Sequence, residues 1–302
     1  MSLFKYLHPD AINYSFKESG FSLRLSQPAA LNDPFEIRHK PFSGINEAFE
    51  NTPIENSLLA ATQGDIELTK SEIIEFYKKA EKTRNEAYSY IMNIYNRSTE
   101  AITEKRYGII SLSSNKQSRP MWSYYSKNNS GFLVEFSSKE IEKDVIDFPN
   151  YMSFINKLVQ EANRSHIKKR AMNMKKTMIL KSIGDLDFME VNYNSVRPEN
   201  LNGNISKFDL LIKDEAWSHE LEWRCILPLS LEKSNTYDNN GFPIKEIIIP
   251  HEYIKNITLG LNSSQSMKRR IQHWIDNFSP ATKLYQTTLN TSQYHFDYML
   301  IK

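Results

Sequence analysis

The sequence predicts an α+β fold in which a mixed, largely antiparallel sheet is combined with a long helical layer. Short segments with two-residue alternation, or with a run of apolar residues between turn signals, are typical of strands. Such segments lie at 21–26, 107–113, 131–136, 186–193, 220–229, 242–250, 256–261, 283–290 and 293–301. They do not alternate strictly with helical segments, which favours α+β over a doubly wound sheet. The last two are separated by Thr291 and Ser292, which predicts a hairpin.

Two long segments, 44–105 and 151–182, are predicted to be helical insertions in a single domain of residues 1–302. From Ile73 to Tyr95, apolar residues recur every three to four positions, and this spacing indicates one buried stripe of a helix. Two shorter helices are predicted at 9–20, between Pro9 and Gly20, and at 205–217.

Composition excludes several classes of protein. Hydrophobic residues make up 40% of the 302 residues, which is enough apolar material for a core. Cys225 is the single cysteine, so a disulfide within the chain is impossible and cytoplasmic residence is expected. The first residues lack the apolar core of a signal peptide, and no apolar run approaches the roughly 18 residues of a membrane span, so no membrane association is expected. No glycine-rich phosphate loop or histidine-based metal spacing occurs, and no metal is predicted.

Charge is balanced overall, at +2, but residues 164–181 hold seven Lys and Arg and no acid. A solvated helix face is the ordinary explanation for such a run. The alternative is a docking surface for nucleic acid or for a protein target. Nothing in the sequence predicts the oligomeric state.

The first informative motif is SQPAALNDPFE, residues 26–36, which follows a predicted strand directly. Asn32 and Asp33 favour a turn because their side chains bind nearby backbone N–H groups. One interpretation is a capped turn. The other is that Asn32, Asp33 and Glu36 face a pocket at the end of the strand.

The second motif spans residues 118–136. Ser118 and Pro120 are typical of a helix start, and Gly131 of its end. Trp122 and Tyr125 lie three residues apart and therefore share a helix face. They are either core residues or a stacking wall for a flat ligand.

The third motif is WSHELEWR, residues 217–224. Interpreted as a strand, it places Glu220, Glu222 and Arg224 on one face, opposite Trp223. Two adjacent carboxylates on one face repel each other and can raise a carboxyl pKa, which suits acid–base chemistry. A solvent-facing edge strand with a weak Glu–Arg pair is the alternative.

With these motifs together, the chain resembles a bacterial family known as domain of unknown function 2971. The family pattern begins with a Lys-Tyr strand, here Lys5-Tyr6, and continues with the three motifs in order. The matching positions are Asn32, Asp33, Pro34, Phe35, Glu36, Ser113, Met121, Trp122, Tyr125, Gly131, Lys213, Trp217, Glu220, Glu222 and Arg224. The resemblance implies association with bacterial toxin and phage-defence systems and leaves the reaction unassigned.

A further resemblance is to ADP-ribosyltransferases, which carry Arg or His, then Ser-x-Ser, then Glu-x-Glu on successive strands. This chain has Arg24, Ser111-Leu112-Ser113 and Glu220-Leu221-Glu222 in that order. The resemblance implies NAD as a co-substrate, Glu222 as the carboxylate that stabilises an oxocarbenium-like ribose, and Glu220 as the residue that orients the acceptor. Arg24 would hold the pyrophosphate, and Trp122 or Tyr125 would stack on nicotinamide.

Two alternatives stay open at this stage. A metal-dependent nuclease would use Asp33, Glu36, Glu220 and Glu222 as oxygen ligands, with Lys213 contacting phosphate. A non-catalytic sensor or antitoxin-like module would instead use Glu36, Glu222 and Arg224 as a buried ion network that ties strands together.

Overall fold

The structure is a computed structural model. It describes residues 1–33, 35–36, 69–83, 86–87, 89–90, 93–94, 107–146, 175–197, 208–229, 236–238 and 241–301.

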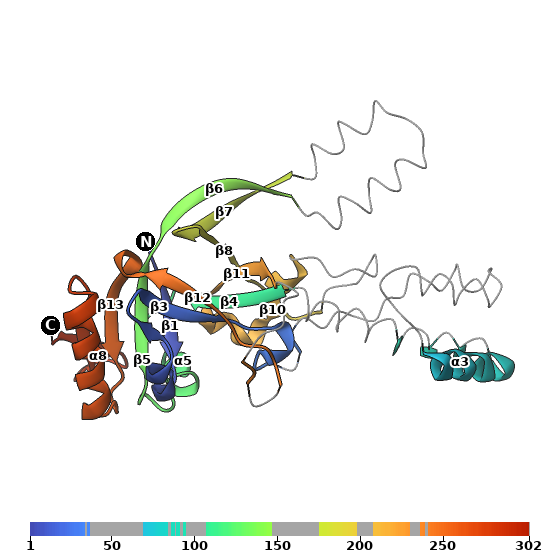
Figure 1. Ribbon diagram of the computed structural model, residues 1–302, viewed down its shortest axis with the longest axis horizontal. Helices are drawn as coiled ribbons and strands as arrows, with labels where there is room; N and C mark the ends of the chain where they lie inside the picture. The colour runs from blue at the N-terminus through green and yellow to red at the C-terminus, as the bar shows by residue number, and fades with distance from the viewer. Residues whose placement is uncertain are drawn as a thin grey trace.

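The largest sheet in this described part of the chain has ten strands in the order β15-β14-β13-β5-β1-β4-β11-β8-β7-β6 (Figure 1). Their bounds are β1 Ser2–Leu7, β4 Tyr107–Ser113, β5 Phe132–Ser137, β6 Lys139–Ile146, β7 Lys175–Ile183, β8 Leu186–Glu190, β11 Glu222–Pro228, β13 Ile254–Leu259, β14 Lys283–Leu289 and β15 Phe296–Leu300. Strands β13 and β14 are parallel and the other neighbours are antiparallel. The predicted α+β class with a mixed, largely antiparallel sheet is therefore confirmed, and so is the hairpin formed by β14 and β15.

Smaller elements complete the described fold. A three-stranded sheet has the order β12-β3-β2, and a parallel pair joins β10 to β9. The bounds are β2 Phe16–Lys17, β3 Gly20–Leu25, β9 Asn192–Asn194, β10 Ile212–Asp214 and β12 Lys245–Pro250. The helices are α3 Lys70–Lys82, α5 Arg119–Tyr124 and α8 Gln265–Phe278, with 3-10 turns η1 Pro9–Asn13, η2 Pro28–Ala30, η3 Asp209–Leu211, η4 Glu215–Glu220 and η5 His251–Tyr253. None of the described helices is long and apolar enough to cross a bilayer.

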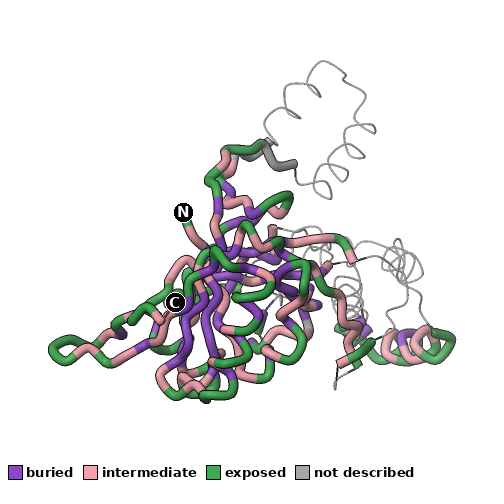
Figure 2. Tube along the Cα trace, turned by 60° about the vertical axis from the view of Figure 1, so that its left-hand side comes forward, coloured by how far each residue is buried: buried purple, intermediate pink, exposed green. Residues whose placement is uncertain are grey.

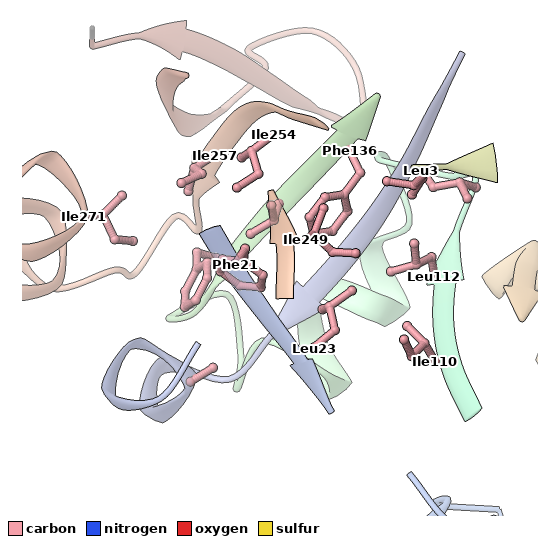
Figure 3. Close-up of a cluster of buried hydrophobic side chains, with 14 of the residues drawn as sticks. Leu3, Phe21, Leu23, Ile110, Leu112, Phe136, Ile249, Ile254, Ile257 and Ile271 are labelled. Carbon is pink, nitrogen blue, oxygen red and sulfur yellow. The ribbon is translucent and has the colours of Figure 1, made fainter. Parts of the chain in front are cut away.

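The main hydrophobic core lies between one face of the ten-stranded sheet, the small sheet and α8. Figure 3 shows Phe21, Leu23 and Ile249 of the small sheet beside Ile110 and Leu112 of β4. From α8, the residues that join this core recur at helical spacing, and they are Met267, Ile271, Trp274 and Ile275. Most of the buried segments gather in the middle of the molecule (Figure 2).

The register of β4 and β11 sorts apolar from polar side chains. Ser113 pairs with Glu222, and Ser111 pairs with Arg224. Directly paired residues project from the same face of a sheet, and successive residues alternate between faces. Ile110, Leu112, Trp223 and Cys225 therefore enter the core, so the two serines, the glutamate and the arginine all lie on the opposite face.

The helical insertion predicted at 151–182 is wrong in its last part, because residues 175–183 form strand β7. Within β7 Leu180 is buried and its neighbour Ile179 is 60% exposed, as expected for a strand with two different faces. Lysine, methionine and leucine favour helix by propensity, but pairing with β6 and β8 overrides this preference here. The rest of that prediction, and residues 164–174 of the basic segment, lie outside the described residues.

The predicted helix at 205–217 is also wrong. Its described part consists of η3, strand β10 and the start of η4. Asp214 ends the strand and caps η4 by accepting the Ala216 N–H at 2.8 Å. Lys213 thus lies on a strand.

The predicted short helix at 9–20 ends earlier, at Asn13, and Gly20 begins β3 with φ +149°. In the helical insertion predicted at 44–105, the described helix α3 begins at a Thr69–Glu72 capping box and ends at Lys82. Residues 44–68 lie outside the described part.

Helix α5 begins as predicted, with Ser118 at its N-cap and Pro120 in its first turn. Gly131, however, is not a left-handed cap, because Lys127, Asn128 and Asn129 take the positive φ values. Gly131 is required for another reason: a Cβ there would lie 2.0 Å from the Leu7 carbonyl oxygen. This close approach places the residue before β5 against the end of β1.

We expect Gly131→Ala to lower the free energy of unfolding by about 1–3 kcal/mol, because backbone must move to admit the methyl group. Tyr124→Ala on α5 is the control, since Tyr124 is 68% exposed and such surface changes stay within about 0.5 kcal/mol. Urea unfolding measures both. Equal stability of the two variants would contradict the close approach at Gly131.

Candidate functional site

A cavity of about 230 Å³ opens on the polar face of the sheet, where β1, β4 and β11 meet residues 26–36 and the end of α5. Its polar lining comes from all three sequence motifs and from β1, β4 and β10. These residues are Lys5, Tyr6, Ser26, Asn32, Glu36, Ser111, Ser113, Tyr125, Lys213, Glu220, Glu222 and Arg224. The fold therefore gathers most of the predicted site residues around one space.

The backbone that carries the two glutamates of the third motif is not one continuous strand. Glu222 is the first residue of β11, whereas Glu220 ends η4. Between them Leu221 adopts a left-handed conformation, with φ 43° and ψ 55°, and is 47% exposed. Such backbone is costly for a residue other than glycine. The predicted strand from residue 220 is thus corrected, but both carboxylates still face one site.

Lys213 bridges the two carboxylates. Its Nζ donates to Glu220 Oε2 at 2.6 Å and to Glu222 Oε2 at 2.9 Å, and Glu36 Oε2 lies 3.9 Å away. The Trp217 ring lies 5.4 Å from the same nitrogen, a distance that permits a cation–π contact. The lysine side chain is only 3% exposed, so it acts as a fixed internal cation.

Arg224 clamps Glu222 from the other side. Its Nε lies 2.7 Å from Glu222 Oε1 and its Nη2 lies 3.0 Å from Oε2, which is a two-pronged contact. Nη1 donates to the Leu210 carbonyl at 2.6 Å, and Glu36 forms a further ion pair with the guanidinium. Arg224 therefore ties β11 to the 26–36 segment and to η3.

Burial and charge act in opposite directions on these groups. Burial raises the pKa of the Glu222 carboxyl, and the nearby Lys213 only partly offsets this effect. Burial tends to lower the pKa of Lys213, but Glu222 and Glu220 outweigh it and raise that pKa. Burial lowers the pKa of Arg224 to about 9, which leaves the guanidinium charged at neutral pH. The expected raised carboxyl pKa thus occurs at Glu222, with burial rather than crowding as its main cause.

Glu220 is as deeply buried as Glu222, but apart from Lys213 it has different partners. The Tyr125 hydroxyl donates to Glu220 Oε1 at 2.5 Å, and Asn32 Nδ2 donates to that hydroxyl at 3.1 Å. The Ser113 hydroxyl donates to the Glu220 main-chain carbonyl at 2.5 Å and so fixes the turn before β11. Burial, followed by the charge of Glu220, raises the pKa of Tyr125, so this phenol stays a hydrogen-bond donor.

Four predicted site residues do not line the cavity: Trp217, whose ring lies against Lys213, and three residues with other roles. Arg24 does not line the cavity, because it forms an ion pair with Asp238 at 2.7 Å. Trp122 is fully buried and packs with Tyr6 and Phe296, so it belongs to the core and not to a stacking wall. Asp33 is buried and caps the turn by accepting the Phe35 N–H at 2.9 Å, and its charge acts on Arg224.

Sequence reasoning missed Lys5 and Tyr193 as parts of the site. Lys5 Nζ donates to the Ser111 carbonyl at 2.7 Å inside the cavity. The Tyr193 hydroxyl accepts the Glu222 N–H at 2.8 Å. A lysine within the otherwise apolar strand Ser2–Leu7 was an available signal, because unpaired charge inside a strand of this kind needs a partner. Tyr193 carried no such signal.

The carboxylates of the site are paired with lysine and arginine side chains. In the described segments, no group of three or more His, Cys, Asp or Glu side chains is arranged to hold a metal ion. Glu220 and Glu222 instead share the ammonium of Lys213. Their two bonded oxygens can be no more than about 5.5 Å apart, so the two carboxylates are close neighbours, as is the carboxyl pair of retaining glycosidases. The arrangement suits chemistry at a carbon that develops positive charge.

A family model described as "Protein of unknown function (DUF2971)" matches residues 121–225. The resemblance inferred from the sequence is therefore shown for the segment from α5 to β11. This segment contains Tyr125, Lys213, Glu220, Glu222 and Arg224, whereas residues 26–36 precede it. No curated protein and no solved structure matches the chain.

We expect Arg224→Met to lower the free energy of unfolding by about 3–5 kcal/mol, because Glu36 and Glu222 lose a buried counter-charge. Arg24→Met is the matched control. Its ion pair with Asp238 is partly exposed, so its loss is expected to cost at most about 1 kcal/mol. Chemical denaturation of both variants measures the difference. An equal loss of stability in the two variants would show that the Arg224 contacts stabilise the fold no more than the Arg24–Asp238 pair does.

Proposed function

We propose that the chain is an NAD-consuming enzyme, an ADP-ribosyltransferase or NAD glycohydrolase, that cleaves the bond between nicotinamide and ribose. The observation that carries this proposal is the pair of carboxylates, Glu220 and Glu222, held by Lys213 at the edge of one cavity. Cleavage of an N-glycosidic bond builds oxocarbenium character at the ribose, as in glycoside hydrolysis. A fixed carboxylate stabilises that charge.

In this proposal Glu222 faces the anomeric carbon, where Arg224 and Lys213 hold its carboxylate in place. Nicotinamide leaves with the electron pair of the broken bond and becomes neutral. The acceptor, which is water or a group on a macromolecule, forms the new bond and gives its proton to Glu220. Tyr125 keeps Glu220 oriented through their 2.5 Å hydrogen bond.

The size of the cavity fits one end of this substrate. Pockets that enclose a whole drug-sized ligand measure about 300–1,000 Å³, and this cavity measures about 230 Å³. The nicotinamide and its ribose would enter, and the adenosine part would lie outside. Of the two residues predicted to stack on a ligand, Tyr125 lines the space and the buried Trp122 does not.

The order of strands gives further support. Strands β1, β4 and β11 are neighbours, and they carry Lys5, the Ser111–Ser113 strand end and Glu222. The cationic strand of the ADP-ribosyltransferase pattern would then be β1, since Arg24 is engaged by Asp238. A role in a bacterial toxin or phage-defence system, with a nucleic acid or protein acceptor, follows from the resemblance stated above.

A second candidate is a non-catalytic sensor or antitoxin-like module. The ion network of Glu36, Arg224 and Glu222 favours it, because these contacts join distant segments whether or not a substrate exists. In that case changes at the site alter stability alone, and purified protein has no activity toward NAD.

The enzyme proposal predicts that purified protein releases nicotinamide from NAD, alone or with DNA, RNA or protein as the acceptor. Glu222→Gln should lower kcat by about 100- to 1,000-fold, because one charge-stabilising group is lost. Chromatography of nicotinamide measures the reaction. Exposed Glu246 on β12 provides the control, and Glu246→Gln should keep full activity.

Tyr125→Phe separates activity from folding, because it removes one hydroxyl at the cavity edge and leaves the Glu222–Arg224 pair intact. A variant with an unchanged melting temperature and reduced kcat supports the enzyme. A wild-type protein that neither binds NAD by calorimetry nor forms ADP-ribose products with any acceptor refutes it.

The pH profile provides an independent prediction. Because burial raises the pKa of Glu222, its active ionised form is lost as pH falls through a value above the ordinary glutamate pKa of about 4.3. The rate should therefore rise with pH along an acid limb whose midpoint lies above that value. An acid limb at the ordinary glutamate pKa would argue against Glu222 as the reacting carboxylate.

A further inference from the structure

The cavity contains one cation without an acidic partner, and this cation is Lys5. Of the three cations in the site, Lys213 and Arg224 each contact two or more carboxylates. Among the described residues, Lys5 Nζ has no carboxylate within ion-pair distance and donates one hydrogen bond, to the Ser111 carbonyl. An ammonium has three donors, so two remain for another acceptor.

The position of Lys5 follows from the way the strands separate. Strands β1 and β4 pair only at Phe4 and Ser113. Further along, Ile109 of β4 bonds instead to Ser26, which enters after β3. The Lys5 side chain lies where β1 and β4 have parted, and its nitrogen takes the Ser111 carbonyl that β1 leaves free. Lys5, Ser26 and Ser111 all line the cavity at this gap.

The charges around Lys5 do not remove its capacity to bind an anion. Glu222 and Glu220 influence the ammonium through space, but Lys213, Arg224 and Tyr125 already occupy both oxygens of each carboxylate. Burial lowers the pKa of Lys5, as expected for a cation that has left water without a strong partner. An anionic ligand atom would supply that partner.

We propose that Lys5 forms an oxyanion subsite of the cavity, which receives a phosphate or carboxylate oxygen of the ligand. A lysine ammonium binds a phosphate oxygen as a compact point charge with several donors. If NAD is the substrate, a step that rests on the function proposed above, the oxygen belongs to the pyrophosphate. The subsite itself depends only on the unpaired ammonium and the cavity.

Calorimetry with three probes tests this subsite: inorganic pyrophosphate, acetate and ADP-ribose. Wild-type protein should bind at least one of the two simple anions, and the stronger of them identifies the oxyanion class. Lys5→Met should weaken the binding of that anion and of ADP-ribose about 10- to 100-fold, because a charge-assisted hydrogen bond is worth about 1.5–3 kcal/mol and 1.4 kcal/mol is tenfold. Lys5→Arg should retain most of the affinity.

Lys255→Met is the matched control, since Lys255 is 48% exposed and pairs with Glu135 outside the cavity. Its affinities should equal those of the wild type. Should Lys5→Met fail to fold, acetic anhydride labelling of wild-type protein replaces it. The bound anion should then protect Lys5 and leave Lys255 reactive.

The outcomes separate this subsite from the proposed reaction. Anion binding that depends on Lys5, in a protein that never cleaves NAD, supports the subsite and refutes the NAD-consuming enzyme. NAD cleavage with an unchanged KM in Lys5→Met refutes the subsite and leaves the reaction standing. Equal affinity of wild type and Lys5→Met for every probe also overturns it, and so does the absence of any anion binding.

Discussion

The buried ammonium of Lys213, held between Glu220 and Glu222, is the contact on which the arrangement of the site depends. Taking ions out of water costs several kcal/mol for each, and the cost is recovered only when partners and hydrogen bonds are complete. Here the partners come from β10, η4, β11 and the 26–36 segment. None of these segments can move away without leaving a charge unpaired in the interior. The cluster therefore fixes the relative positions of elements that are far apart in the sequence.

The same requirement accounts for the backbone around Leu221. A regular strand from residue 220 onward would project Glu220 and Glu222 from one face with fixed spacing. The chain instead ends η4 at Glu220, takes a left-handed conformation at Leu221 and begins β11 at Glu222. The conformational cost at Leu221 is tolerated because the Ser113 hydroxyl and Lys213 hold the residue before it. Strain of this kind is found where surrounding contacts over-determine a functional arrangement.

Sequence reasoning succeeded where a local pattern decides the structure. The alternation in the third motif predicted that Glu222 and Arg224 share a face opposite Trp223, and the Ser118–Pro120 pair predicted the start of α5. It failed where a distant partner decides. Lys213 lies on a strand because β10 pairs with β9, and Arg24 is removed from the site by Asp238, 214 residues further along the chain. Trp122 illustrates a third case, since helical spacing identifies a shared face but not whether that face meets a ligand or the core.

The two carboxylates are not equivalent, and their difference bears on how such a site could serve both stability and chemistry. Glu222 is held by both Arg224 and Lys213, so moving it would break its contacts with two buried cations. Glu220 bonds to Lys213 and to Tyr125, and Tyr125 in turn contacts Asn32 at the edge of the cavity. A ligand that displaces the tyrosine hydroxyl would change the environment of Glu220 while the Glu222–Arg224 pair stays in place. The Glu222–Arg224 pair can thus provide a rigid, preorganised charge, and Glu220 can respond, through Tyr125, to what enters the cavity.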